Sequence, residues 1–127
     1  MTREADVVTR VRLSEKFDLF HAHWEPKIVG QVNDMHVKLA KLEGEFVWHA
    51  HEHEDELFLV VKGQLVLRLR DQDDVVLGPG DFAVVPRGVE HLPVAEEEVH
   101  LLMIEPASTL NTGTVGGERT VSDLEWI

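Results

Sequence analysis

Short stretches of alternating apolar and polar residues dominate the chain between Gln31 and Ile104. Stretches of this kind, separated by turn residues, are typical of β-strands. Helix signals are scarce by comparison. The best of them begins at Ser14, a residue type suited to the N-cap, and covers about one turn before Phe17 and Phe20. We expect a short turn there, not a packed helix, and β-structure in most of the remainder.

The predicted strands are a few residues long and are bounded by Gly, Pro, Asn or Asp; they cover residues 35–42, 45–51, 56–61, 64–70, 75–77, 82–85 and 100–104. Turns are expected at Asn33–Asp34 and at residues 78–81 and 86–88, and Lys62–Gly63 is expected to form a hairpin turn. Many short strands at even spacing indicate an antiparallel sandwich or barrel.

The alternation is cleanest over residues 64–70. Leu65, Leu67 and Leu69 should face inward there, while Val66, Arg68 and Arg70 face outward. The tail, residues 105–127, is rich in Thr, Gly and Ser and should be mostly irregular from Ala107 onward. Its terminal residues include Leu124, Trp126 and Ile127, which would form an exposed apolar patch in water. We therefore expect them to pack on the barrel or on a partner subunit.

Composition limits the class of protein. A length of 127 residues predicts one domain, residues 1–127. The absence of cysteine excludes disulfides and thiolate metal sites. Charged residues at positions 3, 4 and 6, with no long apolar run, argue against a signal peptide or membrane span, so a cytoplasmic location is expected. A net charge of −12 argues against nucleic acid and anionic membranes as partners.

The candidate chemistry lies in two separated segments that carry His49, His51, Glu56 and His91. Neutral imidazole and carboxylate are the ligands that borderline divalent metals favour, and four of them can close around one ion. The period of two along a strand places His49 and His51 on one face. Four ligands leave room for water or substrate on Zn, Fe, Mn, Ni or Co, among which the sequence does not choose.

The first segment reads Gly44-x4-His49-x-His51-x4-Glu56-x6-Gly63, and the second reads Gly80-x5-Pro86-x-Gly88-x2-His91. Together they resemble the two signature motifs of the cupin superfamily, and they cover residues 44–91. The resemblance implies a cupin-type double-stranded β-helix, a jelly-roll-like antiparallel barrel of all-β class. It also implies one metal ion bound by His49, His51, Glu56 and His91, and a homodimer.

Two positions depart from the family pattern. Gly44 stands one residue closer to His49 than is usual, which affects a turn and not a ligand. Ala95 replaces an asparagine that often follows the last histidine by four residues, so a contact supporting the ligands is missing.

Several other residues compete for a place in the site. Asp55 and Glu54 are alternatives to Glu56, and His53 continues the alternation from His49, either as a ligand or at the rim of the barrel mouth. His21 and His23 form a second His-x-His without supporting glycines and are interpreted as structural. His36 and His100 fall in strands and are expected to be core or surface residues. The alternative for His36 is that it contacts the metal ligands and supports them.

Two classes of function remain open. The first is a metalloenzyme acting on a small polar metabolite by isomerase-, dioxygenase- or decarboxylase-like chemistry. The second is a non-catalytic module that binds metal or a small ligand as a sensor, store or accessory protein. Lys38 is the one candidate for an inward cation that would hold a phosphosugar. Some apolar residues could line a pocket, although most should simply fill the barrel: Phe46, Phe58, Val60, Leu65, Leu67, Phe82 and Val84.

Overall fold

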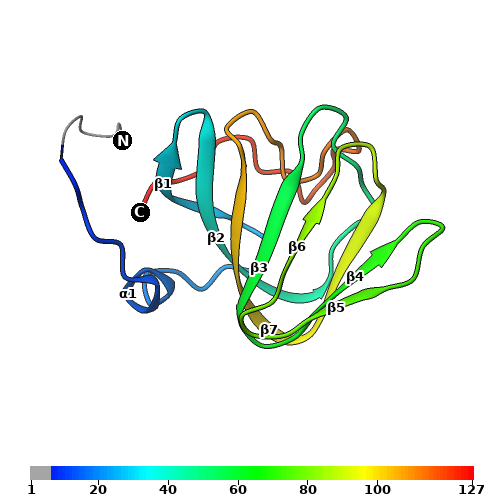
Figure 1. Ribbon diagram of the computed structural model, residues 1–127, viewed down its shortest axis with the longest axis horizontal. Helices are drawn as coiled ribbons and strands as arrows, with labels where there is room; N and C mark the ends of the chain where they lie inside the picture. The colour runs from blue at the N-terminus through cyan, green and yellow to red at the C-terminus, as the bar shows by residue number, and fades with distance from the viewer. Residues whose placement is uncertain (1–6) are drawn as a thin grey trace.

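The computed structural model describes residues 7–127; the charged positions 3, 4 and 6 lie outside the described residues (Figure 1). One short helix precedes seven strands: α1 (Leu13–Phe17), β1 (Lys27–Val32), β2 (Met35–Glu45), β3 (Glu56–Lys62), β4 (Leu65–Leu69), β5 (Val75–Leu77), β6 (Phe82–Val85) and β7 (His91–Pro106). Within residues 7–127, no helix combines the length and apolar character needed to cross a membrane.

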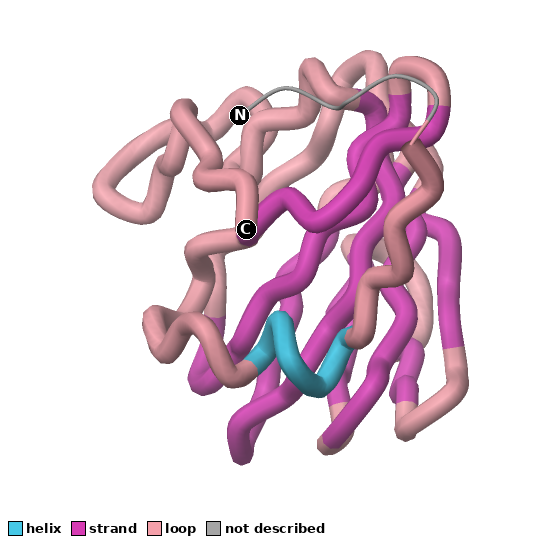
Figure 2. The backbone as a smooth tube through the Cα atoms, turned by 90° about the vertical axis from the view of Figure 1, so that its left-hand side faces the viewer, coloured by secondary structure: helices cyan, strands magenta, loops and turns pink. Residues whose placement is uncertain are grey.

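The longest strand, β7, organises the sheet. It pairs with β2 along one edge and with both β3 and β4 along the other, while β1, β6 and β5 extend the sheet from β2, β3 and β4. Every strand pairing is antiparallel. The strands curve around a common interior without closing into a continuous hydrogen-bonded ring (Figures 1 and 2). The expected all-β antiparallel architecture is confirmed.

The predicted hairpin turn at Lys62–Gly63 is wrong. Strands β3 and β4 do not pair with each other, and they run in the same direction along β7, from Leu57 opposite Ile104 to Leu69 opposite His91. The chain only bends between them, at Gly63, which has a φ of +89°. A glycine at positive φ permits either a bend or a reversal. Pairing of both β3 and β4 with β7 requires a bend here and not a reversal. The local sequence does not show that the two strands share this partner.

Three other strand predictions need correction. The strand expected at residues 45–51 is absent, because β2 continues through a bulge at Leu42–Gly44 and ends at Glu45. The strand expected at residues 100–104 begins as early as His91, since residues 91–95 pair with β4 and β2. Strand β1 begins at Lys27, so four of its six residues lie before Gln31, where no strand was expected; it pairs with β2 across the predicted Asn33–Asp34 turn.

The expected turn near Ser14 is a five-residue helix that packs against the body. Helix α1 has Arg12 at its N-cap without a side-chain cap, so Ser14 lies inside the helix. Phe17 is buried and forms an outer cluster with Phe20 and Leu39. Figure 2 shows the helix lying against the outside of the strands. The aromatic pair stabilises the turn by burial where the local capping signals were weak.

Both faces of the central strands are buried, and strand parity separates them. On β2, Ala40 and Leu42 face the barrel interior, whereas Leu39 between them faces the outer cluster. On β4, Leu65 and Leu67 are buried and Arg68 is exposed, which confirms that alternation. The same parity turns three charged residues inward, namely Lys38, Glu56 and Glu105.

The C-terminal residues lie against the body of the same chain. Ile28 N donates a hydrogen bond to Glu125 O (2.9 Å), and Ile127 N donates one to Ile28 O (3.0 Å). Ile127 packs on the outer cluster, and the Trp126 ring meets the His36 ring edge-on at 5.5 Å. These contacts place the apolar end of the tail against β1 and β2.

The bend at Gly63 is open to a direct test. A Cβ added at this position would lie 2.8 Å from Glu98 O, whereas a Cβ added at Gly80, which has a similar φ of +86°, would meet nothing within 4 Å. Gly80→Ala should therefore lose about 1 kcal/mol of unfolding free energy from backbone strain alone. Gly63→Ala should lose about 1–3 kcal/mol more, because a backbone atom must shift. Urea unfolding measures both; equal losses would contradict the close approach.

Candidate metal centre

The four predicted ligand residues come from three parts of the fold. Glu56 is the first residue of β3, and His91 is the first residue of β7. His49 and His51 lie in the irregular segment that joins β2 to β3, and not in a strand. His49 is nevertheless anchored, because its N–H donates to His91 O (3.1 Å) and its carbonyl accepts from His91 N–H (2.9 Å).

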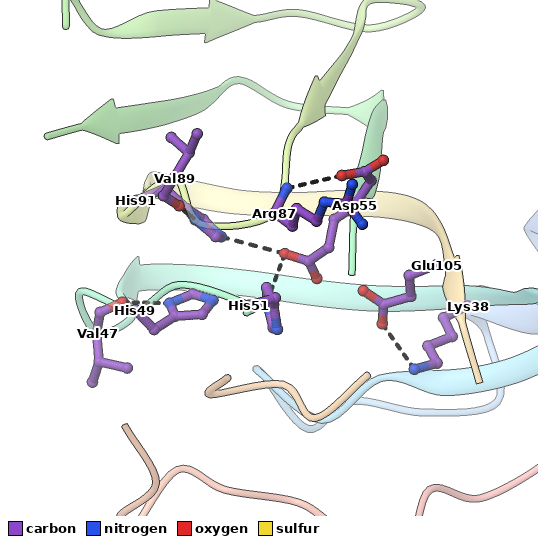
Figure 3. Close-up of polar contacts among 10 residues, drawn as sticks. Lys38, Val47, His49, His51, Asp55, Arg87, Val89, His91 and Glu105 are labelled. Atoms are coloured by element: carbon purple, nitrogen blue, oxygen red, sulfur yellow. Dashed lines mark hydrogen bonds and ion pairs between the residues drawn. The ribbon is translucent and has the colours of Figure 1, made fainter. Parts of the chain in front are cut away.

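Further hydrogen bonds tie the two segments together. Gly88 N donates to His51 O at 2.8 Å, and Arg87 N donates to Asp55 Oδ1 at 2.8 Å (Figure 3). Asp55 is thus engaged in holding the second segment and is not part of the cluster. The predicted turn at residues 86–88 is therefore held beside His51 by the Gly88 hydrogen bond.

The side chains of His49, His51, Glu56 and His91 converge. One potential ligand atom from each lies within 4.8 Å of all the others, and the four residues are at most 3% exposed. Glu56 Oε1 lies 2.8 Å from His51 Nε2 and 3.3 Å from His91 Nε2. Figure 3 draws the contacts of His51 and His91 as dashed lines that end on the same carboxylate.

The backbone determines which imidazole nitrogens are available. His49 Nδ1 lies 2.8 Å from Val47 O, and His91 Nδ1 lies 2.9 Å from Val89 O. A carbonyl oxygen only accepts, so each Nδ1 must carry the proton and donate it. The Nε2 lone pairs of His49 and His91 are therefore left free, which is the arrangement that second-sphere hydrogen bonds impose on metal-binding histidines.

Several atoms in the centre are buried without a hydrogen-bond partner. They include Nε2 of His51 and of His91 and Oε1 of Glu56, whose close contacts are not aligned as hydrogen bonds. Leaving buried polar atoms unpaired costs about 1–3 kcal/mol each. A divalent cation would satisfy all three at once, since a lone pair is what each offers. The residues present thus fit a metal ion.

Electrostatics in the cluster follow from burial and crowding. Burial, and then the neighbouring His91, lower the pKa of His49 to about 4. Burial raises the pKa of Glu56, but the Glu105 carboxyl and the imidazoles of His51 and His91 outweigh it and hold that pKa well below its ordinary value. Neutral imidazole beside an ionised carboxylate is the protonation state that binds a cation.

A buried ion pair that sequence reasoning did not assign to the site adjoins the cluster. Lys38 Nζ donates to Glu105 Oε1 at 2.8 Å, and both side chains are at most 3% exposed (Figure 3). Burial and the neighbouring Glu56 raise the pKa of Glu105 well above its ordinary value, while Lys38 opposes the rise. Glu105 lies on the same inward face of β7 as Leu101 and Met103. A charged residue at an inward position of an otherwise apolar row is the sequence feature that could have identified it.

A cavity opens beside the cluster and contains about 440 Å³ of space, its mouth included. His49, Glu56 and Glu105 reach it, together with Asn111 from the tail. Its other walls are apolar side chains: Trp24, Pro26, Ala40, Leu42, Phe46, Phe58, Pro93, Leu101 and Met103. Of the residues expected to line a pocket, Phe46 and Phe58 do so. Val60, Leu65 and Leu67 fill the core, and Phe82 and Val84 are exposed.

The remaining histidines and acids lie outside the cluster. The His53 side chain is 80% exposed, and Glu54 accepts a hydrogen bond from Ser108 Oγ. His23 contacts Glu98 at 2.7 Å on the surface. His100 stacks on Phe17 outside the barrel, and His36 lies against the Trp126 ring near the C-terminus. Ala95 is buried in the apolar core without a side chain able to support the ligands.

Comparison with known proteins agrees with this geometry. The family model described as "Cupin domain" matches residues 35–105. This chain is a cupin. The crystal structure of a cupin-2 domain-containing protein from Shewanella frigidimarina is 46% identical, with a TM-score of 0.73, over 76% of this chain and 93% of that one. A Neisseria meningitidis structure is 27% identical, with a TM-score of 0.72, over 78% of this chain and all of that one.

A curated relative extends the likeness without adding a function. The uncharacterized protein YdbB of Bacillus subtilis is 40% identical over 63 residues, which are 50% of this cupin. The match spans only 56% of the length of YdbB.

The lowered pKa of His49 predicts how the chelator-treated cupin responds to acid. Below about pH 6.5 His49 is protonated in the unfolded chain but stays neutral in the folded chain. The free energy of unfolding therefore falls as the pH drops toward 4. We expect a loss of about 2 kcal/mol from this residue by pH 5. Urea unfolding between pH 7 and 5 should show a shallower decline in His49→Gln. The exposed control His53→Gln should match the unaltered cupin, and an unchanged decline in His49→Gln would contradict the assignment.

Proposed function

We propose that this cupin binds one divalent metal ion through His49, His51, Glu56 and His91. The observation that carries the proposal is the set of unpaired, buried Nε2 and Oε1 atoms that face one another. Three imidazoles and one carboxylate suit Zn, Fe, Mn, Ni or Co, and a five- or six-coordinate ion keeps at least one position for a ligand. The homodimer and the cytoplasmic location expected from the sequence stay predictions.

We further propose that the cupin is a metalloenzyme acting on a small organic molecule in the adjoining cavity. A metal in this cluster would supply a Lewis acid able to polarise an oxygen of the substrate. His49 and Glu56 belong both to the cluster and to the cavity wall, so a molecule in the cavity would lie next to the ion. The chain's own contribution is to hold neutral imidazoles in one tautomer and to exclude water with apolar walls.

A phosphosugar is a poor candidate for this substrate. Among the described residues lining the cavity there is no lysine or arginine. Lys38 is the inward cation anticipated from the sequence, but it is committed to Glu105 inside the protein. Arg68 lies outside, near the Trp48 ring. Arg119, whose guanidinium lies 5.8 Å from the ring centres of Trp24 and Phe46, is not among the residues that line the cavity. Phosphate recognition relies on such cations, so isomerase chemistry on a phosphosugar held inside the cavity is disfavoured.

Metal content is the first test. Elemental analysis of untagged protein should give about one divalent ion per chain, and saturating metal at a hundred times its Kd should add about 2.7 kcal/mol to stability. His51→Ala and His91→Ala should each lose most of the ion and its stabilising effect. His53→Ala removes an exposed neighbouring histidine and should retain both. Unchanged metal content in the first two variants would remove the proposed site.

Turnover separates an enzyme from a binding module. The metal-loaded cupin is assayed against a panel of small metabolites, with oxygen consumption recorded for candidate diketones and thiols. Metal-dependent turnover that His91→Ala abolishes is the expected result. An inert ion and no turnover across the panel would instead favour a non-catalytic sensor, store or accessory protein.

A further inference from the structure

The distribution of polar atoms around the cavity is uneven. Aromatic and aliphatic side chains form most of its wall, including the rings of Trp24, Phe46 and Phe58. Trp24 and Phe46 stack at 4.8 Å between ring centres, and Trp24 Nε1 donates to Glu43 O, so the indole N–H is already paired and is not offered to a ligand. A ligand that enters must therefore present an apolar body to most of its surroundings.

Apart from the proposed metal ligands, the described polar residues that reach the cavity are Glu105 and Asn111, and the Asn111 amide is already paired with Arg119 O and Val121 N. Glu105 is 2% exposed, and Oε1 is held by Lys38, whereas Oε2 is buried and receives no hydrogen bond from an N–H or O–H group of the described residues; the carboxyl contacts that of Glu56. Figure 3 shows its carboxylate on the side of the strands that faces the histidine cluster. An unpaired buried oxygen at a cavity wall is satisfied when a ligand brings a hydrogen-bonding group.

Lys38 fixes Glu105 in this position. Lys38 and Glu105 occupy the inward rows of adjacent strands β2 and β7, and their ion pair lies in the interior. Because Lys38 holds Oε1 of Glu105, the carboxyl group cannot rotate freely, and the position of Oε2 is fixed as well. The Lys38–Glu105 ion pair is costly to bury, and the apolar core does not need it. A pair of this kind suits a binding or positioning role.

We propose that the cavity binds a small uncharged molecule with an apolar body and a hydroxyl group, and that Glu105 positions this hydroxyl beside the metal-ligand cluster. The inference rests on the proposed use of the cavity as a ligand site. A hydroxyl both donates and accepts, so it pairs with Glu105 in either protonation state. A carboxylate or phosphate would instead meet Glu56 and Glu105 with no free cation from the described wall residues to offset them.

The space of about 440 Å³ includes the open mouth, so the cavity suits a ligand with a small apolar body. This ligand differs from the small polar metabolite expected from the sequence, because most of its surface would be apolar and its polarity would lie in one or a few hydroxyl groups.

Phenol and toluene form the test pair, because they differ in a hydroxyl against a methyl group of similar size. Dissociation constants are measured by calorimetry on chelator-treated protein and on zinc-loaded protein. Phenol should bind about tenfold more tightly than toluene in both forms, the ratio that one hydrogen bond to a buried carboxyl provides. Benzoate should bind the chelator-treated protein more weakly than phenol.

Variants assign the preference to Glu105. The double variant Lys38→Met/Glu105→Leu removes both charges and should bind toluene at least as well as before, which also shows that the cavity is intact. Its preference for phenol should disappear. Glu105→Gln keeps a hydrogen-bonding group and should keep the preference. Lys41→Met alters a buried lysine that bonds Phe20 O on the opposite face of β2, and it should leave both affinities unchanged.

The outcomes separate this inference from the metal proposal. A preference for phenol that depends on Glu105 while none of Zn, Fe, Mn, Ni or Co binds would end the metal proposal and support the inference. Zinc binding at one ion per chain with equal affinities for phenol and toluene would overturn the inference alone. A preference that survives in the double variant, or tighter binding of benzoate than of phenol by chelator-treated protein, would also overturn it.

Discussion

Two backbone hydrogen bonds between His49 and His91 hold the centre together. They join an irregular segment to the first residue of the longest strand, so the position of one ligand segment is set by the main chain of the other. The Nδ1 atoms of both rings are held by carbonyls within their own segments, Val47 O and Val89 O. Position and tautomer are thus fixed by the backbone before any ion binds, which limits the ordering that binding requires.

Strand parity accounts for what else reaches the interior. Glu56, Phe58 and Val60 alternate inward on β3, and Leu101, Met103 and Glu105 do so on β7. The rows that build the apolar core therefore also deliver two carboxylates to the same region. Placing them near each other is unfavourable unless cations or hydrogen bonds compensate. Lys38 compensates Glu105, and the three imidazoles surround Glu56, so each carboxylate has its own means of stabilisation.

The sequence predicted the local features well and the long-range ones less well. Alternation at residues 64–70 and the turns at Asn33–Asp34 and 78–81 were readable because they depend on neighbours in the chain. The spacing of His49, His51, Glu56 and His91 anticipated residues that the structure brings together. The bend at Gly63 and the first half of β7 depend on strand partners distant in sequence. No local pattern specifies which partner a strand will take.

Carboxylates on the surface of this cupin are stabilised by water, whereas those in its interior need a specific partner. The chain carries a net charge of −12, and exposed acids such as Glu96 and Glu97 lie where β7 bulges outward beside Gly63. Those groups are hydrated and cost little. Inside, each ionised carboxylate must be balanced by a specific partner within a few ångströms. A cation in the cluster would balance Glu56 and reduce the repulsion between Glu56 and Glu105. Metal binding and the hydrogen-bonding capacity of Glu105 are therefore expected to be coupled, through the contact between these two carboxyls.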